Sequence, residues 1–337
     1  MTSSIRVGLI GCGGIAKRHV NWFLGHASCE IGALCDTSTE AVEDKAALVS
    51  ELRPDLEVSK ETDYNALLAR SDLDAVAVLL PHHLHHPVIK AALQAGKHVL
   101  TEKPMVTSVA EARELIALAE SNNLHLGIAY QRSYIPEYRL VKQMVAKGEL
   151  GKIQFINAHL EQDWLKIGQD VDARRRWRRD PAQSGGGQLV DTGSHTVAAM
   201  LDVSHLTPAE VFAFQDKSDL DIDVNTVLSV RFAEGALAAM TIGGYGSKAV
   251  TEVLRIVGDK GSARIFFRTV REQSLEVNGE MIDAKSTITA SNPNENFVET
   301  LLGNTVIGAT SNLGLRVAQL SEAAYQSAQT NQPILVN

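Results

Sequence analysis

The first 130 residues alternate short apolar runs with longer amphipathic stretches. Runs rich in Val, Ile and Leu predict strands, and stretches with apolar residues three and four positions apart predict helices. The predicted strands are Ile5–Ile10, Glu30–Cys35, Ala75–Leu80, His98–Thr101 and His125–Tyr130. The helices predicted between them are Ile15–Leu24, Ser38–Leu52, Pro87–Ala95 and Val109–Asn122. Strands that are apolar on both faces and alternate with helices indicate a doubly wound parallel sheet.

From about residue 131 the pattern changes to longer strands that are separated by turns. After a helix over Pro136–Lys147, the predicted strands are Ile153–Glu161, Ala209–Gln215, Val224–Ala233, Ala236–Gly243, Thr251–Val257, Ala263–Arg268 and Ser274–Val277. Turns such as Asn278-Gly279 suit hairpins, because Asn and Gly accept positive φ. We expect two later helices, Asn294–Gly303 and Asn312–Thr330, to cover one face of this sheet. Residues 131–337 are therefore predicted to form an α+β domain around a large, mostly antiparallel sheet.

The composition is that of an ordinary globular protein with two packed cores. Of the 337 residues, 45% are hydrophobic and 21% are charged, and the formal net charge is -8. Nucleic acids and membrane surfaces attract basic proteins, so this charge argues against both as partners and favours a small molecule. No basic leader precedes an apolar run, and no apolar stretch is long enough to span a bilayer, which predicts a cytoplasmic protein.

A glycine turn joins the first predicted strand to the first helix. The turn fits the GxGxxG pattern with Ala in the last position, and its residues are Gly11, Cys12, Gly13, Gly14, Ile15 and Ala16. Glycines let the backbone approach a pyrophosphate, whose charge is stabilised by the N-terminus of the helix. A tight turn without a nucleotide has the same local sequence, but a second strand that ends in an acid favours a dinucleotide site here.

Asp36 ends the second predicted strand about 20 residues after the glycine turn, the spacing at which a carboxylate accepts hydrogen bonds from the adenosine ribose. The carboxylate would repel a 2′-phosphate, and no Arg or Lys lies between Asp36 and Lys45. The sequence therefore favours NAD over NADP, with Asp36 and Thr37 at the ribose. An Asp that only caps the following helix fits the local sequence equally well.

Polar residues follow the later strands of the first half at the point where each strand ends. Ligands of an open parallel sheet bind beyond these carboxyl ends. The segments are Pro81-His82-His83-Leu84-His85-His86-Pro87, Glu102-Lys103-Pro104 and Tyr130-Gln131-Arg132. We expect Pro81, His82 and His85 to contact the nicotinamide end of the cofactor, and the alternative for the histidines is a solvated surface.

Neither the histidines nor the cysteines predict a metal site. The histidine turn has no Cys partner, and a turn between two prolines cannot easily direct several imidazoles at one ion. The three cysteines, Cys12, Cys29 and Cys35, form no CxxC pair and lie where free thiols pack as small apolar groups. The sequence predicts no metal and no disulfide.

Lys103 is the strongest single candidate for chemistry. A lysine beside a cationic nicotinamide has its charged form disfavoured and could exchange a proton near neutral pH. A cis bond to Pro104 could fix its direction. The alternative is that Glu102 and Lys103 form an ordinary surface ion pair, which contributes little.

In this order and spacing, the motifs resemble the family of glucose-fructose oxidoreductase, inositol dehydrogenase and rhizopine catabolism proteins, abbreviated Gfo/Idh/MocA. The resemblance extends over nearly the whole chain. Besides the glycine turn, the matching motifs are Pro81-x-x-x-His85, Glu102-Lys103-Pro104, Trp177-Arg178, Gly185-Gly186-Gly187 and Asp191-x-Gly193-x-His195. It implies a Rossmann domain over residues 1–130 that binds NAD(P), and a substrate domain over residues 131–337 whose sheet is open on one face and buried in dimers or tetramers.

The same resemblance implies the catalytic group. Lys103, Asp191 and His195 match the family's catalytic positions, and Glu102 matches a cofactor contact. A base would remove the proton of a secondary ring hydroxyl while its carbon delivers hydride to C4 of the nicotinamide. His195 is the best candidate for the base, because imidazole titrates near neutral pH, and Lys103 would stabilise the alkoxide or relay the proton. Asp191 and His195 would share a face if this stretch is helical.

Further substrate contacts are predicted from stretches that face the sugar in the family. The residues are Arg132, Trp164, Trp177 and Tyr245, each of which is also typical of a domain interface. The run Asp172–Asp180 is unusually basic for the family, with five arginines at Arg174, Arg175, Arg176, Arg178 and Arg179. The guanidinium groups could hold the carboxylate or phosphate of an acidic sugar or sugar nucleotide. A solvated face and ion pairs between subunits are the alternatives.

The predicted activity is therefore that of an NAD-dependent oxidoreductase acting on a secondary hydroxyl of a monosaccharide, inositol or sugar derivative. A glycosidase that keeps NAD bound and oxidises C3 transiently is an alternative within the family, although its hydrolytic members tend to carry export signals. A non-catalytic NAD-sensing regulator is an alternative of another class, since fold does not dictate function. The presence of both Lys103 and His195 favours an enzyme.

Overall fold

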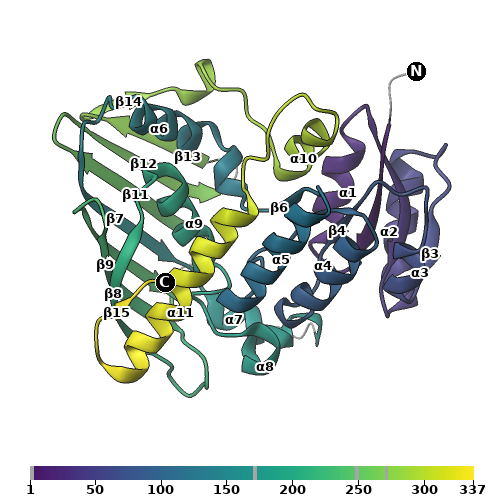
Figure 1. Ribbon diagram of the computed structural model, residues 1–337, viewed down its shortest axis with the longest axis horizontal. Helices are drawn as coiled ribbons and strands as arrows, with labels where there is room; N and C mark the ends of the chain where they lie inside the picture. The colour runs from purple at the N-terminus through teal and green to yellow at the C-terminus, as the bar shows by residue number, and fades with distance from the viewer. Residues whose placement is uncertain (1–3, 170–172, 247–249, 270–271) are drawn as a thin grey trace. The chain divides into compact units, whose positions relative to one another are not determined.

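The chain forms two compact units, which we describe separately (Figure 1). The computed structural model describes residues 4–169, 173–246, 250–269 and 272–337. Unit 1 comprises Met1–Val106, Ala110–Ala129 and Ser291–Asn312, and unit 2 comprises Thr107–Val109, Tyr130–Ala290 and Leu313–Asn337. The change of pattern near residue 130 coincides with the junction at Ala129 and Tyr130, whereas Ser291–Asn312, which was expected in the second domain, returns to unit 1.

Unit 1 is built on a six-stranded, fully parallel sheet in the order β3-β2-β1-β4-β5-β6. Its strands are β1 (Ile5–Ile10), β2 (Cys29–Cys35), β3 (Ser59–Glu61), β4 (Ala75–Val78), β5 (His98–Thr101) and β6 (Leu126–Ile128). Its helices are α1 (Ala16–Leu24), α2 (Thr39–Leu52), α3 (Tyr64–Leu68), α4 (His85–Gln94), α5 (Val109–Ser121) and α10 (Pro293–Leu301). This order confirms the doubly wound sheet, whose strand order reverses at β1 and β4.

Helix α10 packs into unit 1. Val20 and Phe23 of α1 are completely buried in the same hydrophobic cluster as Phe297 and Val298 of α10. The prediction that residues 294–303 cover the C-terminal sheet is wrong, because the apolar face of this helix is buried against α1 instead. An amphipathic pattern shows which face a helix buries, but not the partner against which it is buried.

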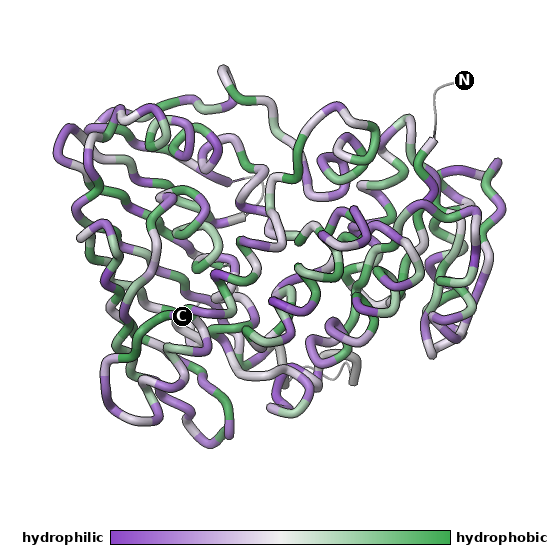
Figure 2. Tube along the Cα trace, in the orientation of Figure 1, coloured by the Kyte–Doolittle hydropathy of each residue, from purple (hydrophilic) through white to green (hydrophobic). Residues whose placement is uncertain are grey.

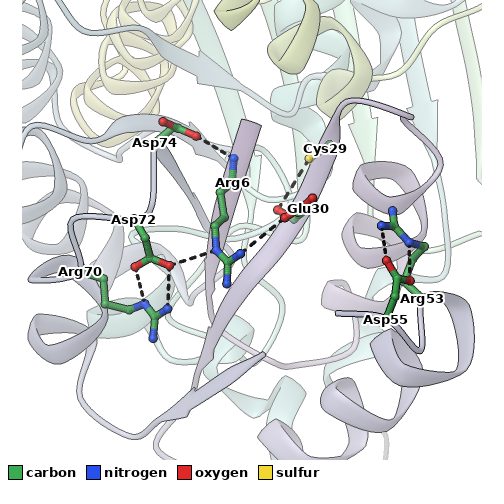
Figure 3. Close-up of polar contacts among 8 residues, drawn as sticks. All are labelled: Arg6, Cys29, Glu30, Arg53, Asp55, Arg70, Asp72 and Asp74. Atoms are coloured by element: carbon green, nitrogen blue, oxygen red, sulfur yellow. Dashed lines mark hydrogen bonds and ion pairs between the residues drawn. The ribbon is translucent and has the colours of Figure 1, made fainter. Parts of the chain in front are cut away.

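The amino ends of the strands of unit 1 carry a network of ion pairs (Figure 3). The guanidinium of Arg6 on β1 lies 3.5 Å from Glu30 on β2 and 3.0 Å from Asp72. The backbone amide of Arg6 donates a hydrogen bond to Asp74. These side chains are partly exposed, so each pair contributes little to stability. The charges lie at the opposite ends of the strands from the glycine turn.

Unit 2 contains a nine-stranded, mostly antiparallel sheet in the order β14-β13-β12-β11-β7-β10-β9-β8-β15, in which only β7 and β10 pair in parallel. Its strands are β7 (Ile153–Glu161), β8 (Pro208–Asp216), β9 (Asn225–Phe232), β10 (Leu237–Gly243), β11 (Thr251–Gly258), β12 (Ser262–Thr269), β13 (Glu272–Val277), β14 (Glu280–Ile282) and β15 (Ile334–Leu335). Its helices are α6 (Pro136–Ala146), α7 (Trp164–Gln169), α8 (Pro181–Ser184), α9 (Gly193–Ser204) and α11 (Ser311–Thr330). The predicted α+β architecture is confirmed.

The two faces of this sheet differ in burial. Hydrophobic and hydrophilic residues alternate along its strands (Figure 2), as expected when one face is packed. Helix α9 packs on the inner face against β7 and β11. The outer face carries exposed apolar side chains in cross-strand register, among them Phe214 and Val227. Within the described part of unit 2, no helix packs over this row.

No helix among the described residues has the length and apolar character that are needed to cross a bilayer. The three thiols are free and buried. Burial raises the pKa of Cys12, Cys29 and Cys35 to about 12 in each case, so the thiols stay protonated and act as apolar packing groups.

Candidate active site

The glycine turn of unit 1 has the shape that a bound pyrophosphate needs. Gly11 has a φ of +104°, and a Cβ there would lie 2.3 Å from the carbonyl oxygen of Leu79, so only glycine fits. A Cβ at Gly13 or Gly14 would meet nothing within 4 Å, which leaves the outer side of the turn open. Ile15 begins α1 without a side-chain hydrogen bond to its first turn. The turn and the helix N-terminus therefore present backbone N–H groups where an anion could bind.

Asp36 is tied to the glycine turn. Its Oδ2 accepts a hydrogen bond of 2.7 Å from the amide of Cys12, and its Oδ1 accepts one of 2.9 Å from the amide of Ser38. The side chain that caps α2 is that of Ser38, which accepts from the amide of Ala41. Asp36 therefore bridges the turn and the β2 end, and the alternative in which it caps the helix is wrong. Neighbouring Thr37 is exposed.

Two histidines of the turn after β4, His82 and His85, are buried. Residues His82–Leu84 form a short 3-10 helix after Pro81, and His82 packs edge-on against His85 at 5.8 Å between ring centres. The ring of His85 lies between two carbonyl oxygens, 2.8 Å from that of Pro104 and 2.9 Å from that of Leu80. Burial lowers the pKa of His85, so the ring is neutral at pH 7 and donates to one of them. His85 therefore braces the turn after β4 against the segment that follows Lys103.

Among the described residues, no group of three or more His, Cys, Asp or Glu side chains is placed to hold a metal ion.

Glu102 and Lys103 follow β5 at the carboxyl edge of the sheet. The amide of Glu102 donates to the carbonyl of Val78 on β4, which fixes the segment beside the sheet. The peptide bond between Lys103 and Pro104 is cis, as the sequence suggested. The side chain of Glu102 is buried and Lys103 is half-buried. The two residues thus lie on the edge where the glycine turn and Asp36 also lie.

In unit 2, Asp191 and Trp164 are brought together. The Asp191 carboxylate is 4% exposed, and its Oδ2 accepts hydrogen bonds from the Trp164 indole at 2.8 Å and from Nε of Arg178 at 3.1 Å. Asp191 lies in the turn before α9, so it does not share a helical face with His195 as the sequence suggested. The carboxylate is a fixed and partly neutralised anion, which suits a hydroxyl-binding role better than that of a mobile base.

His195 lies in the first turn of α9, a helix whose residues are all buried. The Tyr130 ring packs edge-on against the imidazole, with 6.0 Å between ring centres. The hydroxyl of Ser194 donates to the carbonyl of Asp191, which ties the helix start to the preceding turn. His195 is thus held in a rigid part of unit 2.

A buried carboxylate, that of Asp223, accepts hydrogen bonds from the triple-glycine segment before Asp191 and from the turn that follows it. The sequence did not predict this contact. The two oxygens of Asp223 accept from the amides of Gly187 and Leu189, each at 2.8 Å, and the Tyr325 hydroxyl donates to the same carboxylate at 2.5 Å. A Cβ at Gly187 would lie 1.8 Å from the Asp223 carbonyl oxygen. Glycine is needed here because the backbone of residue 223 approaches so closely.

Arg132 belongs to a second buried network on the inner face of the sheet. Its guanidinium lies 3.2 Å from Glu252, which also accepts hydrogen bonds from the hydroxyls of Thr196 and Tyr138. The guanidinium stacks on the Phe267 ring at 3.9 Å. Burial and the Glu252 charge hold the pKa of Tyr138 well above its ordinary value, so the phenol stays a donor. Because Thr196 follows His195 in α9 and donates to Glu252 of β11, this network anchors the helix to the sheet.

The remaining predicted substrate residues occupy different parts of unit 2. The Arg178 guanidinium lies over the Trp177 ring at 4.5 Å, so Trp177 joins the Asp191 group through Arg178. Tyr245 is exposed after β10, and its hydroxyl lies 2.7 Å from that of Ser218. The structure therefore brings Trp164, Trp177 and Asp191 together and places Tyr245 in another hydrogen bond.

The basic run is described only in part. Asp172 lies outside the described residues, as do the side chains of Arg174 and Arg175. Arg176 is exposed, and Arg178 is engaged with Asp191.

Two family models match the chain. A model described as "Oxidoreductase family, NAD-binding Rossmann fold" matches residues 5–130. A model described as "GFO/IDH/MocA C-terminal domain" matches residues 138–264. The match to unit 1 covers the glycine turn, Asp36 and Lys103, and the match to unit 2 covers Asp191 and His195.

Relatives and solved structures align over most of the chain. The protein named uncharacterized oxidoreductase YrbE of Bacillus subtilis strain 168 is 25% identical over 100% of this chain and 98% of its own length. The dTDP-3,4-didehydro-2,6-dideoxy-alpha-D-glucose 3-reductase of Actinomadura kijaniata is 32% identical over 71% of this chain and 68% of its own. The WlbA dehydrogenase from Bordetella pertussis, solved with NADH and UDP-GlcNAcA, superimposes with a TM-score of 0.85, 23% identity and coverage of 99% and 98%.

Proposed function

Because this chain belongs to the Gfo/Idh/MocA oxidoreductase family, we propose that it transfers hydride between a secondary hydroxyl of a monosaccharide, inositol or sugar derivative and C4 of the nicotinamide of NAD. The observation that carries the proposal is the group in unit 2 formed by Asp191 and His195 at the start of a buried helix. A reductase of a nucleotide-linked sugar among the relatives supports the substrate class.

NAD, when bound, supplies the acceptor for hydride. The glycine turn would hold its pyrophosphate, Asp36 its adenosine ribose, and the segments after β4 and β5 its nicotinamide end. We assign the base that takes the hydroxyl proton to His195, because an imidazole can accept and release a proton near pH 7. The Lys103 ammonium would stabilise the negative charge that develops on the substrate oxygen. The reverse proton transfers serve ketone reduction.

Asp191 would bind rather than take the proton. Its carboxylate is already held by Trp164 and Arg178, and a carboxylate oxygen can accept more than one hydrogen bond. A substrate hydroxyl next to the reacting carbon would donate a further hydrogen bond to the Asp191 carboxylate. Trp177, Arg132 and Tyr245 remain proposed substrate contacts, and the proposal assigns them no chemical step.

The test is to measure NADH formation by the purified protein against inositols, aldoses, uronic acids and anhydro-sugars. Reduction of NAD with one stereochemical group of substrates is the expected result and identifies the hydroxyl. If no alcohol in the panel reduces NAD and none of the matching ketones oxidises NADH, the dehydrogenase proposal is wrong. Release of an aglycone from glycosides without net NADH would instead assign the glycosidase activity.

Asp36 is predicted to set the preference for NAD over NADP. Replacing Asp36 with serine and Thr37 with arginine removes the carboxylate and adds a cation for the 2′-phosphate. The NADP-to-NAD ratio of kcat/KM is expected to rise by at least about tenfold, which corresponds to about 1.4 kcal/mol. Glu51→Arg, at the far end of α2, adds the same charge and should leave the ratio unchanged. A wild-type enzyme that already prefers NADP would contradict the assignment.

We also propose that the outer face of the unit 2 sheet is buried in a homodimer or homotetramer. Phe214 and Val227 lie opposite each other on this face and are 60% and 51% exposed. Light scattering should give a mass of two or four times the 36.4 kDa of one chain. A glutamate at both positions should lower the mass to that of a monomer, because it would bury charge in the interface. Val306→Glu is the control, since Val306 is 80% exposed in unit 1. A wild-type monomer would contradict the proposal.

A further inference from the structure

The carboxylate of Glu102 is held by a buried histidine that no motif of the chain identifies. His19 of α1 is completely buried, and its Nε2 lies 3.1 Å from Oε1 of Glu102. The other carboxylate oxygen, Oε2, accepts the amide N–H of Lys103 at 3.2 Å. One carboxylate therefore contacts both the helix that follows the glycine turn and the backbone of the proposed catalytic lysine.

A third residue, Asn294, contacts the other ring nitrogen of His19 and so determines which nitrogen faces Glu102 as a donor. Nδ2 of Asn294, which is completely buried in the first turn of α10, lies 3.0 Å from Nδ1 of His19. An amide nitrogen only donates hydrogen bonds, so Nδ1 must accept and the ring proton is on Nε2. His19 can then donate from Nε2 to Glu102, which stays an acceptor.

Charge around Glu102 favours its ionised form. Burial by itself raises the pKa of this carboxyl, but its interactions with His19, first the hydrogen bond, and the charge of Lys103 outweigh it, so the pKa lies below its ordinary value. The titratable groups that face Glu102 are His19 on α1, Lys103 after β5 and His85 on α4. His19 directs its Nε2 at this carboxylate over 3.1 Å.

We propose that His19 and Asn294 are positioning residues, which hold the Glu102 carboxylate beside Lys103 and so connect the nucleotide-binding helix α1 to the reactive end of the cofactor. The inference rests on the proposed function, because it takes Lys103 and the segment after β5 as the nicotinamide end. Asn294 comes from the segment that returns to unit 1 late in the chain. The site of unit 1 is thus completed by a residue outside the first 130.

The unit contains a matched pair for comparison. Nε2 of His26, just after α1, lies 2.8 Å from Glu299 of α10, so this pair also links the α1 region to α10. It has no contact with Glu102 among the described hydrogen bonds. If His19 only links α1 to other elements, breaking either pair should lower NADH binding and kcat. If His19 positions Glu102, only substitutions of His19 should lower them.

The experiment compares His19→Leu, His19→Gln and His26→Leu in the full chain. The amide nitrogen of glutamine can occupy the place of Nε2 and donate, whereas leucine cannot. His19→Leu is expected to weaken NADH binding and lower kcat by at least about tenfold each, the loss expected for a hydrogen bond to a charged group. His19→Gln should recover both to within a few fold, and His26→Leu should change neither.

The pH dependence of NADH binding gives the readout that a structural role would not move. Without the donor, the Glu102 pKa rises, so the carboxylate becomes protonated at a higher pH as the pH falls. The acid limb of NADH affinity should therefore lie at a higher pH in His19→Leu than in wild type or His19→Gln. Equal acid limbs in all folded variants, or a glutamine variant as impaired as the leucine variant, would overturn the inference.

A spectroscopic measurement separates this inference from the proposed function. In protein labelled with ¹⁵N-histidine, the resonances that vanish in His19→Gln should report a ring proton on Nε2. A ring protonated on Nδ1 would overturn the inference even if the enzyme is active. If no alcohol is oxidised but the tautomer and the shift in NADH binding are as expected, the proposed activity fails and the positioning role stands.

Discussion

Replacing Lys103 with methionine is expected to lower kcat by about 10²-fold or more, the loss typical of a positioned acid or base. Methionine keeps much of the apolar stem but removes the ammonium that would stabilise the substrate oxyanion. His195→Gln should cause a loss of similar size, because an amide cannot take up the hydroxyl proton. The measurement is NADH formation at saturating substrate and NAD, with circular dichroism to confirm that each variant is folded.

Two residues of the same types serve as controls. Lys97 donates to the carbonyl oxygens of Arg70 and Leu73 at 2.7 and 2.8 Å, so Lys97→Met should lower stability and leave kcat within a few fold. His205 is the C-cap residue of α9, whose first turn contains His195, and it has a φ of 58°, so His205→Asn keeps a residue that accepts this conformation. If Lys103→Met or His195→Gln retains kcat within a few fold of wild type, the assigned role of that residue is wrong.

The sequence predicted the parallel sheet of unit 1 and the polar segments at its carboxyl edge, because both depend on local patterns. Apolar runs placed five of the six strands, and the glycine turn required a positive φ at Gly11. The strand that was missed, β3, is the short polar segment Ser59–Glu61 at the edge of the sheet. Edge strands are often short and polar, so they carry little hydrophobic signal.

The position of α10 could not be predicted from its own sequence. The amphipathic pattern of residues 294–303 was recognised, but the burial of α10 against α1 depends on contacts between residues far apart in the chain. Asn294 and His19 illustrate this, since they are separated by 275 positions. Their contact also explains why the first 130 residues alone do not account for the site of unit 1.

Two buried carboxylates of unit 2, Glu252 and Asp223, were missed, and only Glu252 left a signal in the sequence. Glu252 occupies an inward position of β11, where Leu254 and Ile256 are the next inward residues. A charge at such a position must find a partner within the core, so it should have been marked as part of a buried network. Asp223 precedes β9 and shows no comparable pattern, and its contact with Gly187 follows only from the fold.

Glu252→Ala is expected to lower the free energy of unfolding by about 3–5 kcal/mol, because it leaves the Arg132 guanidinium buried without its counter-charge. Thr196 and Tyr138 would also lose their acceptor. The measurement is a urea titration at pH 7 followed by tryptophan emission. Glu276→Ala is the control, since Glu276 pairs with Arg264 at 2.6 Å on the exposed face and should contribute less than about 1 kcal/mol. Equal losses in the two variants would contradict the assignment of Glu252 as a core anchor.

A double variant then separates the two roles of Arg132. Glu252→Leu combined with Arg132→Met removes both charges, and it is expected to recover most of the stability that Glu252→Ala loses. With the fold restored, the KM for the sugar becomes informative. A KM that rises by about tenfold or more would give Arg132 the substrate contact predicted from the sequence, because lost binding energy of about 1.4 kcal/mol has that effect. An unchanged KM would leave Arg132 with the role of counter-charge to Glu252, which anchors α9 and His195 to the sheet.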